Sequence, residues 1–313
     1  MSVLQSPGAD DRGHLLTEQA HPQSGSLDQL TTAALVEMFC RNDLEPQRAV
    51  AAVAPTLTAA VDAIAHRLAE GGRLFYLGAG TSGRLGVLDA AECPPTFCTP
   101  PDLVQGVLAG GAPALLRSSE GLEDLTEAGR HDLEERGFTT RDCLVGIAAG
   151  GTTPYVIGGL RYARSLGALT IALACVPCSQ APMPCDLDIR LLTGPELLTG
   201  STRLKAGTAT KMALNIISTG VMVRLGKVHG NRMVDVAVTN AKLEDRALRM
   251  LHDLAAVDRD RAAALLDEAD GSVKLALMMA ASGLDSQAAR QVIEQHGPQL
   301  RRALDAVGAQ LQL

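Results

Sequence analysis

The chain has 313 residues, of which 46% are hydrophobic and 2% aromatic, and its formal net charge is −7. This length and hydrophobic content suffice for one large α/β domain and a smaller additional part. Nucleic acid is not expected as a partner, because its binding needs clustered basic residues and stacking rings. An odd number of cysteines, seven, favours free thiols in a reducing compartment. With no signal peptide or long apolar run in the sequence, we expect a soluble, cytoplasmic protein that does not bind membranes.

The N-terminal part of the sequence changes from polar to helical. Residues 1–25 are polar and rich in Gly, Pro and Ser, so we expect a flexible segment that is poorly ordered at least at its start. Apolar residues then recur at helical spacing between Leu27 and Met38, and again between Val50 and Leu68. Pro46 suits the first turn of the second helix. We therefore expect helices ahead of the α/β region.

From residue 72 the pattern alternates between short apolar runs, loops and helical stretches. Runs that are apolar throughout are typical of parallel strands covered on both faces. We predict an α/β fold with a doubly wound, five-stranded parallel sheet, in a domain over 26–240 that includes the N-terminal helices. Residues 241–313 read as a small helical bundle (a UBA-like subdomain) broken at Asp270-Gly271 and Gly283. The predicted strands are Leu74–Leu77, Leu103–Leu108, Cys143–Ala148, Leu169–Cys175 and Ile189–Leu192.

Two glycine-rich loops follow predicted strands. The first, Gly78-Ala-Gly-Thr-Ser-Gly83, leads into a helix whose free N–H groups suit an anion. A dinucleotide loop needs only backbone at its variable positions, so the hydroxyls of Thr81 and Ser82 favour a terminal phosphate. The second loop, Gly150-Gly-Thr-Thr-Pro154, offers Thr152 or Thr153 to cap the next helix. A hydroxyl there is also compatible with a phosphate.

A third cluster runs from Glu196 through Ser201 to Lys211 and contains many donors within one loop and a turn or two of helix. Positive charge at a helix start is unfavourable against the helix dipole, which predicts an anion bound among these side chains. A solvated surface helix is the alternative. The candidate binding residues here are Glu196, Ser201, Arg203 and Lys205.

Two carboxylates stand near these loops. Glu92 precedes Cys93-Pro94-Pro95, which we expect to terminate its helix. Glu123 lies in Glu120-Gly-Leu-Glu-Asp124. Two carboxylates near one sugar phosphate act as acid and base when their surroundings separate their pKa values. From the residues alone, the prediction ends at a phosphosugar site with candidate carboxylates.

These segments together resemble the N-acetylmuramic acid 6-phosphate etherases, a family of the sugar isomerase (SIS) domain superfamily. The resemblance covers nearly the whole chain from about Leu16. It rests on Leu77-Gly-Ala-Gly-Thr-Ser-Gly-Arg-Leu-Gly86, Asp89-Ala-Ala-Glu-Cys-Pro-Pro-Thr96, Glu120–Asp124, Gly146–Ala149, Thr199–Ala209, Gly226–Asp235 and Thr239-Asn240.

The resemblance implies cleavage of the lactyl ether of N-acetylmuramic acid 6-phosphate to N-acetylglucosamine 6-phosphate and D-lactate, by elimination and then hydration, in cell-wall recycling. It implies a carbon–oxygen lyase that is a homodimer and needs no cofactor or metal. Glu92 aligns with the proton donor and Glu123 with the proposed base. The implied phosphosugar-binding residues are Gly80, Thr81, Ser82, Thr152, Thr153 and Ser201.

The chain also departs from the family pattern. Gly150-Gly151 stands where Ser-Gly is usual, so one phosphate hydroxyl is missing, and His21-Pro22 replaces Asn-Pro. Three other functions remain open. A sugar-phosphate sensor like the glucokinase regulatory proteins would not need both carboxylates, an aldose–ketose isomerase would share the phosphate loops, and a transcription regulator would need a basic helix-turn-helix. The Cys175, Cys178 and Cys185 group lacks a fourth zinc ligand at usual spacing, so we expect buried thiols there.

Overall fold

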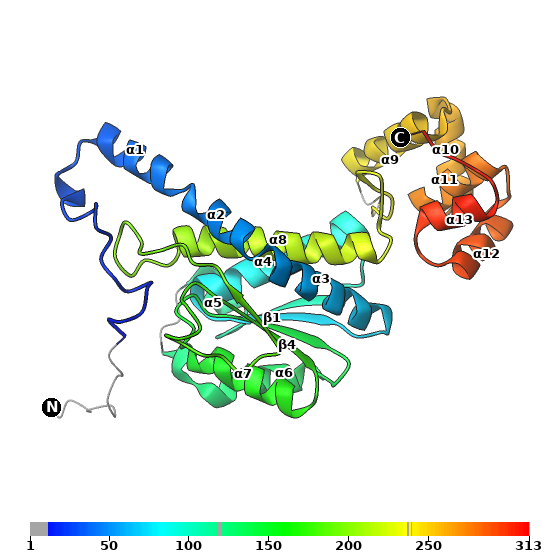
Figure 1. Ribbon diagram of the computed structural model, residues 1–313. Coiled ribbons are helices and arrows are strands. Elements are labelled where there is room, and N and C mark those ends of the chain that lie inside the picture. Colours follow the sequence, from blue (N-terminus) through cyan, green and yellow to red (C-terminus); the bar gives the residue numbers. More distant parts are fainter. Residues whose placement is uncertain (1–11, 118–120, 237, 239, 313) are drawn as a thin grey trace. The chain divides into compact units, whose positions relative to one another are not determined.

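The computed structural model describes residues 12–117, 121–236, 238 and 240–312 of the chain. These residues form two compact units (Figure 1). The first contains the chain up to Asp89 together with Gln105–Ile217, and the second contains Ala90–Val104 together with Ser218–Leu313. We call them the α/β unit and the helical unit.

The α/β unit is built on a five-stranded sheet in the order β2-β1-β3-β4-β5. The β1–β3, β3–β4 and β4–β5 pairs are parallel, with Leu74 opposite Cys143 at the start of β1 and β3. Every residue of β1 and β3 is buried, as expected for strands covered on both faces. The fold class and the five strands predicted from the sequence are confirmed. Their bounds are β1 Leu74–Gly78, β2 Val104–Leu108, β3 Cys143–Ile147, β4 Leu169–Ala174 and β5 Leu187–Arg190.

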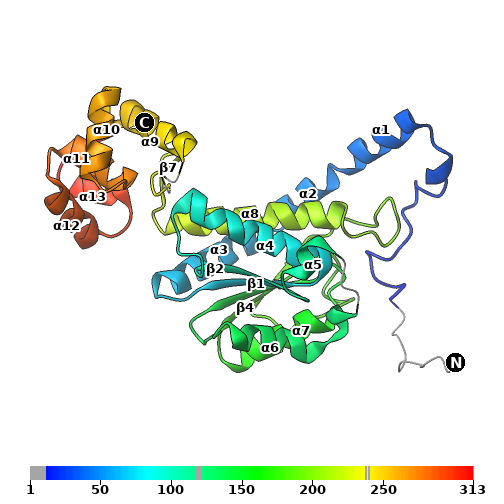
Figure 2. The same cartoon turned by 180° about the vertical axis from the view of Figure 1, so that it is seen from behind.

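Helices cover both faces of this sheet (Figures 1 and 2). Helices α6 (Thr126–Glu135) and α7 (Pro154–Ser165) lie on one face. Helix α3 (Ala54–Ala69) lies on the other with α4 (Gly80–Phe97) and α8 (Lys205–Arg224). The α6 and α7 backbones approach so closely that a Cβ on Gly129 would lie 2.0 Å from the carbonyl oxygen of Tyr155. A glycine is required there, and this contact fixes the start of α7, which borders the site described below.

The buried carboxylate of Asp142 links the N-terminal ends of β1 and β3. Asp142 is 2% exposed, and its two oxygens accept hydrogen bonds from the backbone and guanidinium of Arg73 and from the backbone and hydroxyl of Thr139, at 2.7–3.1 Å. Burial opposes ionisation, yet the hydrogen bonds from Arg73 and Thr139 hold the pKa of Asp142 below its ordinary value. This network fixes the register of β1 against β3. It therefore also fixes where their carboxyl ends lie at the opposite edge of the sheet.

The segment before the sheet contains η1 (Leu27–Gln29), α1 (Thr32–Asn42) and α2 (Glu45–Ala52). Pro46 lies in the first turn of α2, as predicted. The single helix expected between Val50 and Leu68 is instead two helices that meet at Val53. Pro55 lies in the first turn of α3, where its missing N–H costs nothing, whereas the interior of one continuous helix would lose a hydrogen bond there.

Helix α4 spans Gly80–Phe97 and continues through Pro94 and Pro95. The expectation that Cys93-Pro94-Pro95 ends the helix, with Glu92 at its terminus, is therefore wrong. The φ angle of proline fits a helix, so two prolines remove hydrogen bonds without forbidding the conformation. The last turn is held by packing instead, since Cys93 and Phe97 are both buried.

The short elements beside the sheet are α5 (Pro113–Leu116) and η2 (Leu122–Asp124), and the long α8 covers Lys205–Arg224. Taken singly, none of the helices in the described part of the chain is long and apolar enough to cross a membrane, although Thr32–Ala52 and Ala54–Ala69, bent by 59° at their junction, pass that test as a pair.

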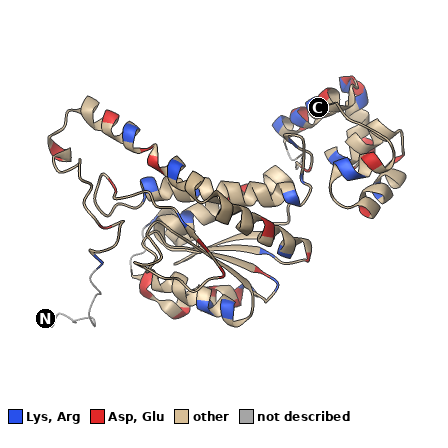
Figure 3. Ribbon diagram, viewed as in Figure 1, with Lys and Arg blue, Asp and Glu red and all other residues tan. Residues whose placement is uncertain are grey.

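The helical unit has its own core, centred on α11, in which Leu275–Met278 are almost fully buried. Asp270 and Gly283 adopt positive φ at the two predicted breaks, which are thus confirmed. Figure 3 shows basic and acidic residues interspersed along α9 and α10. The helices are α9 Ala241–Ala255, α10 Arg259–Glu268, α11 Val273–Ser282, α12 Ser286–His296 and α13 Leu300–Ala306.

A hairpin of two very short strands, β6 (Val228–His229) and β7 (Arg232–Met233), precedes these helices. Asp235, two residues after this hairpin, accepts a hydrogen bond from Lys274 at 2.7 Å and forms an ion pair with Lys227 at 3.1 Å. Lys274 is 8% exposed, so its ammonium group needs this carboxylate as a counter-charge. The ion triad ties the hairpin to α11.

Candidate functional site

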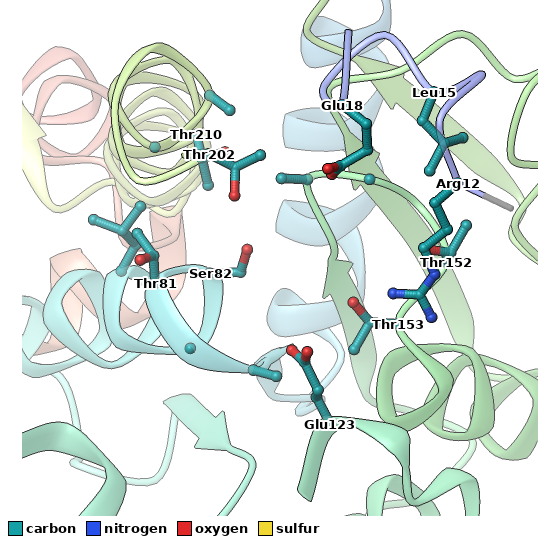
Figure 4. Close-up of a pocket in the computed structure, with 17 residues that line it drawn as sticks. Arg12, Leu15, Glu18, Thr81, Ser82, Glu123, Thr152, Thr153, Thr202 and Thr210 are labelled. Atoms are coloured by element: carbon teal, nitrogen blue, oxygen red, sulfur yellow. The ribbon is translucent and has the colours of Figure 1, made fainter. Parts of the chain in front are cut away.

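The α/β unit contains a cavity of about 280 Å³ beyond the carboxyl ends of β1 and β3, where parallel sheets bind their ligands (Figure 4). Three loops and the N-terminal segment surround it. Its lining comprises Arg12, Leu15, Glu18, Ala79, Gly80, Thr81, Ser82, Leu85, Glu123, Ala149, Gly150, Thr152, Thr153, Thr202, Ala206, Gly207 and Thr210.

The first rim is the loop after β1. Gly80 has a φ of +51°, which favours glycine, and a Cβ on Gly83 would lie 2.4 Å from the carbonyl oxygen of Gly78, so a side chain is disfavoured at these two positions. The tight turn lets α4 begin directly at the cavity. Thr81 and Ser82, in the first helical turn, extend their side chains toward it (Figure 4).

The second rim is the loop after β3. Thr153 occupies the position before α7, with Pro154 in the first turn. The sequence predicts that a threonine hydroxyl caps this helix, but Thr153 makes no capping hydrogen bond. Thr152 and Thr153 line the cavity instead, so their hydroxyls are positioned for a ligand.

The third rim is the start of α8, which contributes Ala206, Gly207 and Thr210. A Cβ on Gly207 would lie 3.5 Å from the side chain of Thr81, so the first and third rims are neighbours. The start of α8 is fixed by Glu196, which is 1% exposed. Its oxygens accept hydrogen bonds from the N–H groups of Lys205 at 3.1 Å and Ala206 at 2.9 Å.

The carboxylate of Glu196 is thus one anion at this helix start, and it belongs to the protein itself. Burial raises its pKa and lowers the pKa of Lys205, which is 3% exposed. Neither residue lines the cavity, nor do Ser201 and Arg203. Arg203 borders a separate apolar groove with Leu197 and Leu198. These four predicted binding residues are therefore not part of the lining.

The two predicted catalytic carboxylates are placed differently. Glu123 follows Gly121, which has a φ of +87°, and its side chain extends into the cavity (Figure 4). Glu92 is exposed on α4 and is not part of the lining. Glu120 and Thr239, also in the predicted motifs, lie outside the described residues.

Arg12, Leu15 and Glu18 also line the cavity, and the sequence does not predict them as site residues, because they belong to the segment predicted to be flexible. Residues 1–11 of that segment lie outside the described residues. The apolar pair Leu15-Leu16 within an otherwise polar stretch is the one indication of order in this segment, since burial of such residues also orders the residues beside them.

The electrostatics of the cavity favour an anion. Helices α4 and α7 begin at its rim, and each helix N-terminus carries about half a positive charge, whereas the first N–H groups of α8 already donate to Glu196. Four hydroxyls, of Thr81, Ser82, Thr152 and Thr153, surround these ends. Such an arrangement suits the several oxygens of a phosphate group.

The candidate zinc cysteines do not form a ligand set. Cys175 is buried, and burial raises its pKa to about 12, whereas Cys178 is exposed and Cys185 half-buried. The expectation of buried thiols thus holds for Cys175 and is wrong for Cys178. Across the described ranges, no three His, Cys, Asp or Glu side chains are grouped to hold a metal ion.

Comparison with known proteins covers both the domain and the whole chain. The family described as "Glucokinase regulatory protein N-terminal SIS domain" matches residues 56–164. An N-acetylmuramic acid 6-phosphate etherase of Synechococcus sp. (strain CC9605) is 72% identical over 303 residues, which are 97% of this chain and 96% of the relative. The chain belongs to the N-acetylmuramic acid 6-phosphate etherase family. It is an enzyme.

Another etherase, from Parasynechococcus marenigrum (strain WH8102), is 70% identical over 99% of both chains. Among solved structures, a putative phosphosugar isomerase from Bacteroides fragilis is 20% identical, with a TM-score of 0.46 over 61% of this chain and 91% of its own. The regulatory-protein domain match includes the first two rims and Glu123. The etherase relatives match over the full length, including α8 and the helical unit.

Proposed function

We propose that this enzyme cleaves the D-lactyl ether of N-acetylmuramic acid 6-phosphate, giving N-acetylglucosamine 6-phosphate and D-lactate, and that it serves cell-wall amino-sugar recycling. Etherase relatives at 70–72% identity over nearly the whole chain support this reaction. The observation that carries it is the cavity itself, in which the carboxylate of Glu123 faces the N-termini of α4 and α7 and the hydroxyls of Thr81, Ser82, Thr152 and Thr153.

The phosphate group of the substrate would be held by Thr81, Ser82, Thr152 and Thr153 together with the N–H groups at the starts of α4 and α7. A phosphate remote from the reacting carbons anchors the sugar throughout the reaction, so its binding energy orients C2 and C3 toward the carboxylate. Glu196 and Lys205, which we predicted to contact substrate, are better assigned as positioning residues, because Glu196 fixes the start of α8.

The elimination requires a base and an acid. In the open-chain sugar, the aldehyde acidifies the C2 proton, and we assign its removal to Glu123. The electron pair forms the C2–C3 double bond as the C3–O bond breaks, and the departing lactate oxygen receives a proton. Water then adds, with its oxygen at C3 and a proton at C2, which gives the product hydroxyl.

The acid is assigned to Glu92, by resemblance to the family's proton donor. We propose that a second copy of the chain supplies Glu92 in a homodimer, the assembly that the family resemblance implies. Helix α1 suits a dimer contact, since it buries no residue within its own chain and leaves Val36 55% exposed. All seven cysteines are free thiols, which supports a reducing cytoplasm as the location.

Lactate release tests the reaction. Purified enzyme would be incubated with N-acetylmuramic acid 6-phosphate, and D-lactate followed with a coupled dehydrogenase. We expect release by the natural enzyme, loss of release in Glu123→Gln, and near-normal release in Asp124→Asn, an exposed neighbour that does not line the cavity. Absence of lactate from the natural enzyme, with measurable phosphosugar binding, would favour the sensor function of the regulatory-protein relatives.

Mixed dimers test the shared site. Glu92→Gln and Glu123→Gln chains, each inactive alone, would be co-expressed with different tags. If each site takes one carboxylate from each chain, random pairing restores about a quarter of the natural activity, because half of the dimers contain one intact site. Activity that stays at the level of the single variants would contradict the shared site and place both carboxylates in one chain.

A further inference from the structure

The residues that precede the α/β fold form an anchored strap, which we define as residues 12–18. Leu15 is 1% exposed and packs with Val176 and Ala181. The backbone N–H of Leu16 donates to Gln180 at 2.9 Å, and the side-chain amide of Gln180 donates back to the carbonyl of His14 at 3.1 Å. The strap is therefore fixed to the loop that follows β4.

Two turns in the strap direct its charged side chains. The N–H of Leu15 donates to the carbonyl of Arg12 at 3.0 Å, and the N–H of Glu18 donates to the carbonyl of Leu15 at 2.9 Å. With Leu15 buried between them, Arg12 and Glu18 both face the cavity (Figure 4). Arg12 lies near Thr152 and Thr153, and Glu18 extends from the other end of the strap.

The proposed substrate carries two acidic groups, a phosphate and a lactyl carboxylate, and each needs a partner in the cavity. Three charged side chains belong to the described lining, namely Arg12, Glu18 and Glu123. The hydroxyls and helix N-termini serve the phosphate. Both glutamates repel a carboxylate, which leaves the guanidinium of Arg12 as its partner, with a planar fork that matches a carboxylate in two parallel hydrogen bonds.

We propose that the strap is part of the substrate site, with Arg12 binding the lactyl carboxylate and Glu18 accepting a hydrogen bond from a neutral donor of the sugar, a hydroxyl or the acetamido N–H. This inference rests on the proposed function. It assigns specificity, because sugar phosphates without the lactyl group lack the carboxylate that Arg12 would bind. It also orients the substrate in the site, because the phosphate and the lactyl group are held by different parts of the chain.

Comparison of substrate with product tests Arg12. A charge-assisted hydrogen bond contributes about 1.5–3 kcal/mol, so Arg12→Ala should raise the KM for N-acetylmuramic acid 6-phosphate about 10- to 100-fold. The inhibition constant of N-acetylglucosamine 6-phosphate, which lacks the lactyl group, should change less than twofold. An equal rise in both constants would show that Arg12 binds the phosphate, and no rise in either would show that it does not touch the substrate. Either result overturns the assignment.

Glu18 is tested by two substitutions. Glu18→Ala should weaken substrate and product alike, since both contain the same hydroxyls and acetamido group, while kcat changes little. Glu18→Gln should restore most of the binding, because its amide oxygen still accepts a hydrogen bond. A Glu18→Gln variant that retains KM but loses kcat would overturn the binding role and indicate proton transfer instead.

The matched control is Gln23→Ala, an exposed residue of the same N-terminal segment outside the cavity lining, which should leave all constants unchanged. Calorimetric titration of the same variants with both phosphosugars separates this inference from the reaction. If the natural enzyme releases no lactate yet Arg12→Ala selectively weakens binding of the lactyl sugar, the reaction fails and the strap assignment stands. If lactate is released and the two sugars are weakened equally, the strap assignment fails alone.

Discussion

Replacement of Asp142 by asparagine should destabilise the α/β unit strongly. The carboxylate of Asp142 is 2% exposed and accepts five hydrogen bonds, three from Arg73 and two from Thr139. An asparagine amide would direct its NH₂ group at the donor groups of Arg73 or Thr139. It would also leave the guanidinium of Arg73 without its counter-charge. Loss of one partner from a buried ion pair costs about 3–5 kcal/mol.

The effect should be visible in both denaturant and thermal unfolding. For a unit of this size, 1 kcal/mol changes Tm by about 2–4 °C, so Asp142→Asn should lower Tm by about 6–20 °C. The control is Glu37→Gln, which removes an exposed ion pair with Arg41 and should cost less than about 1 kcal/mol. Because Asp142 lies at the end of β1 and β3 opposite the cavity, KM should be unchanged at temperatures where the variant is folded.

The pH dependence gives an independent check. The pKa of Asp142 is lowered from 3.8 in the folded chain, so its ionised form stabilises the fold above that value, and this stability is lost as pH falls through the folded pKa. The difference in stability between the natural enzyme and Asp142→Asn should therefore shrink in acid. A cost below 1 kcal/mol, or a difference that is constant down to acid unfolding, would refute this account of the strand register.

Three further outcomes follow from particular contacts. Ser82→Ala should raise KM far more than it lowers kcat, since the phosphate is held throughout the reaction, and equal losses in kcat and kcat/KM would contradict the assignment. Gly150→Ser should fold normally, because its Cβ would meet its nearest neighbour, the hydroxyl of Thr17, at 3.7 Å, an ordinary contact. Its added hydroxyl should lower KM about 2- to 10-fold in steady-state kinetics, and a higher KM would show that the phosphate lies elsewhere. Asp235→Asn should cost the helical unit up to about 3 kcal/mol in chemical denaturation, because the buried ammonium of Lys274 loses its counter-charge, and unchanged stability would mean that the triad is not needed.

Much of the α/β unit follows from the sequence, because buried parallel strands leave an unmistakable apolar pattern. The runs that predict β1 and β3 differ from the observed strands by one residue at most. The least accurate is β5, predicted as Ile189–Leu192 and observed as Leu187–Arg190. This edge strand alternates apolar and polar residues, so an apolar run does not mark its limits.

Residues whose role depends on burial could not be assigned from the sequence. The sequence predicts Glu196 as a substrate ligand and cannot show that it is buried and accepts two backbone hydrogen bonds at the start of α8. Glu18 lies in a polar stretch whose order depends on the burial of Leu15 against a loop about 160 residues later. The helical continuation through Pro94 and Pro95 likewise depends on tertiary packing that overrides a strong local signal.

Isotope labelling tests the central claim, that the ether is broken by elimination at C3 and followed by hydration. The reaction would be run in water enriched in ¹⁸O and deuterium, and both products analysed by mass spectrometry. The account predicts one solvent oxygen at C3 and one deuterium at C2 of N-acetylglucosamine 6-phosphate, with the ether oxygen retained in an unlabelled lactate. Solvent oxygen in the lactate, or a product sugar without deuterium at C2, would contradict it.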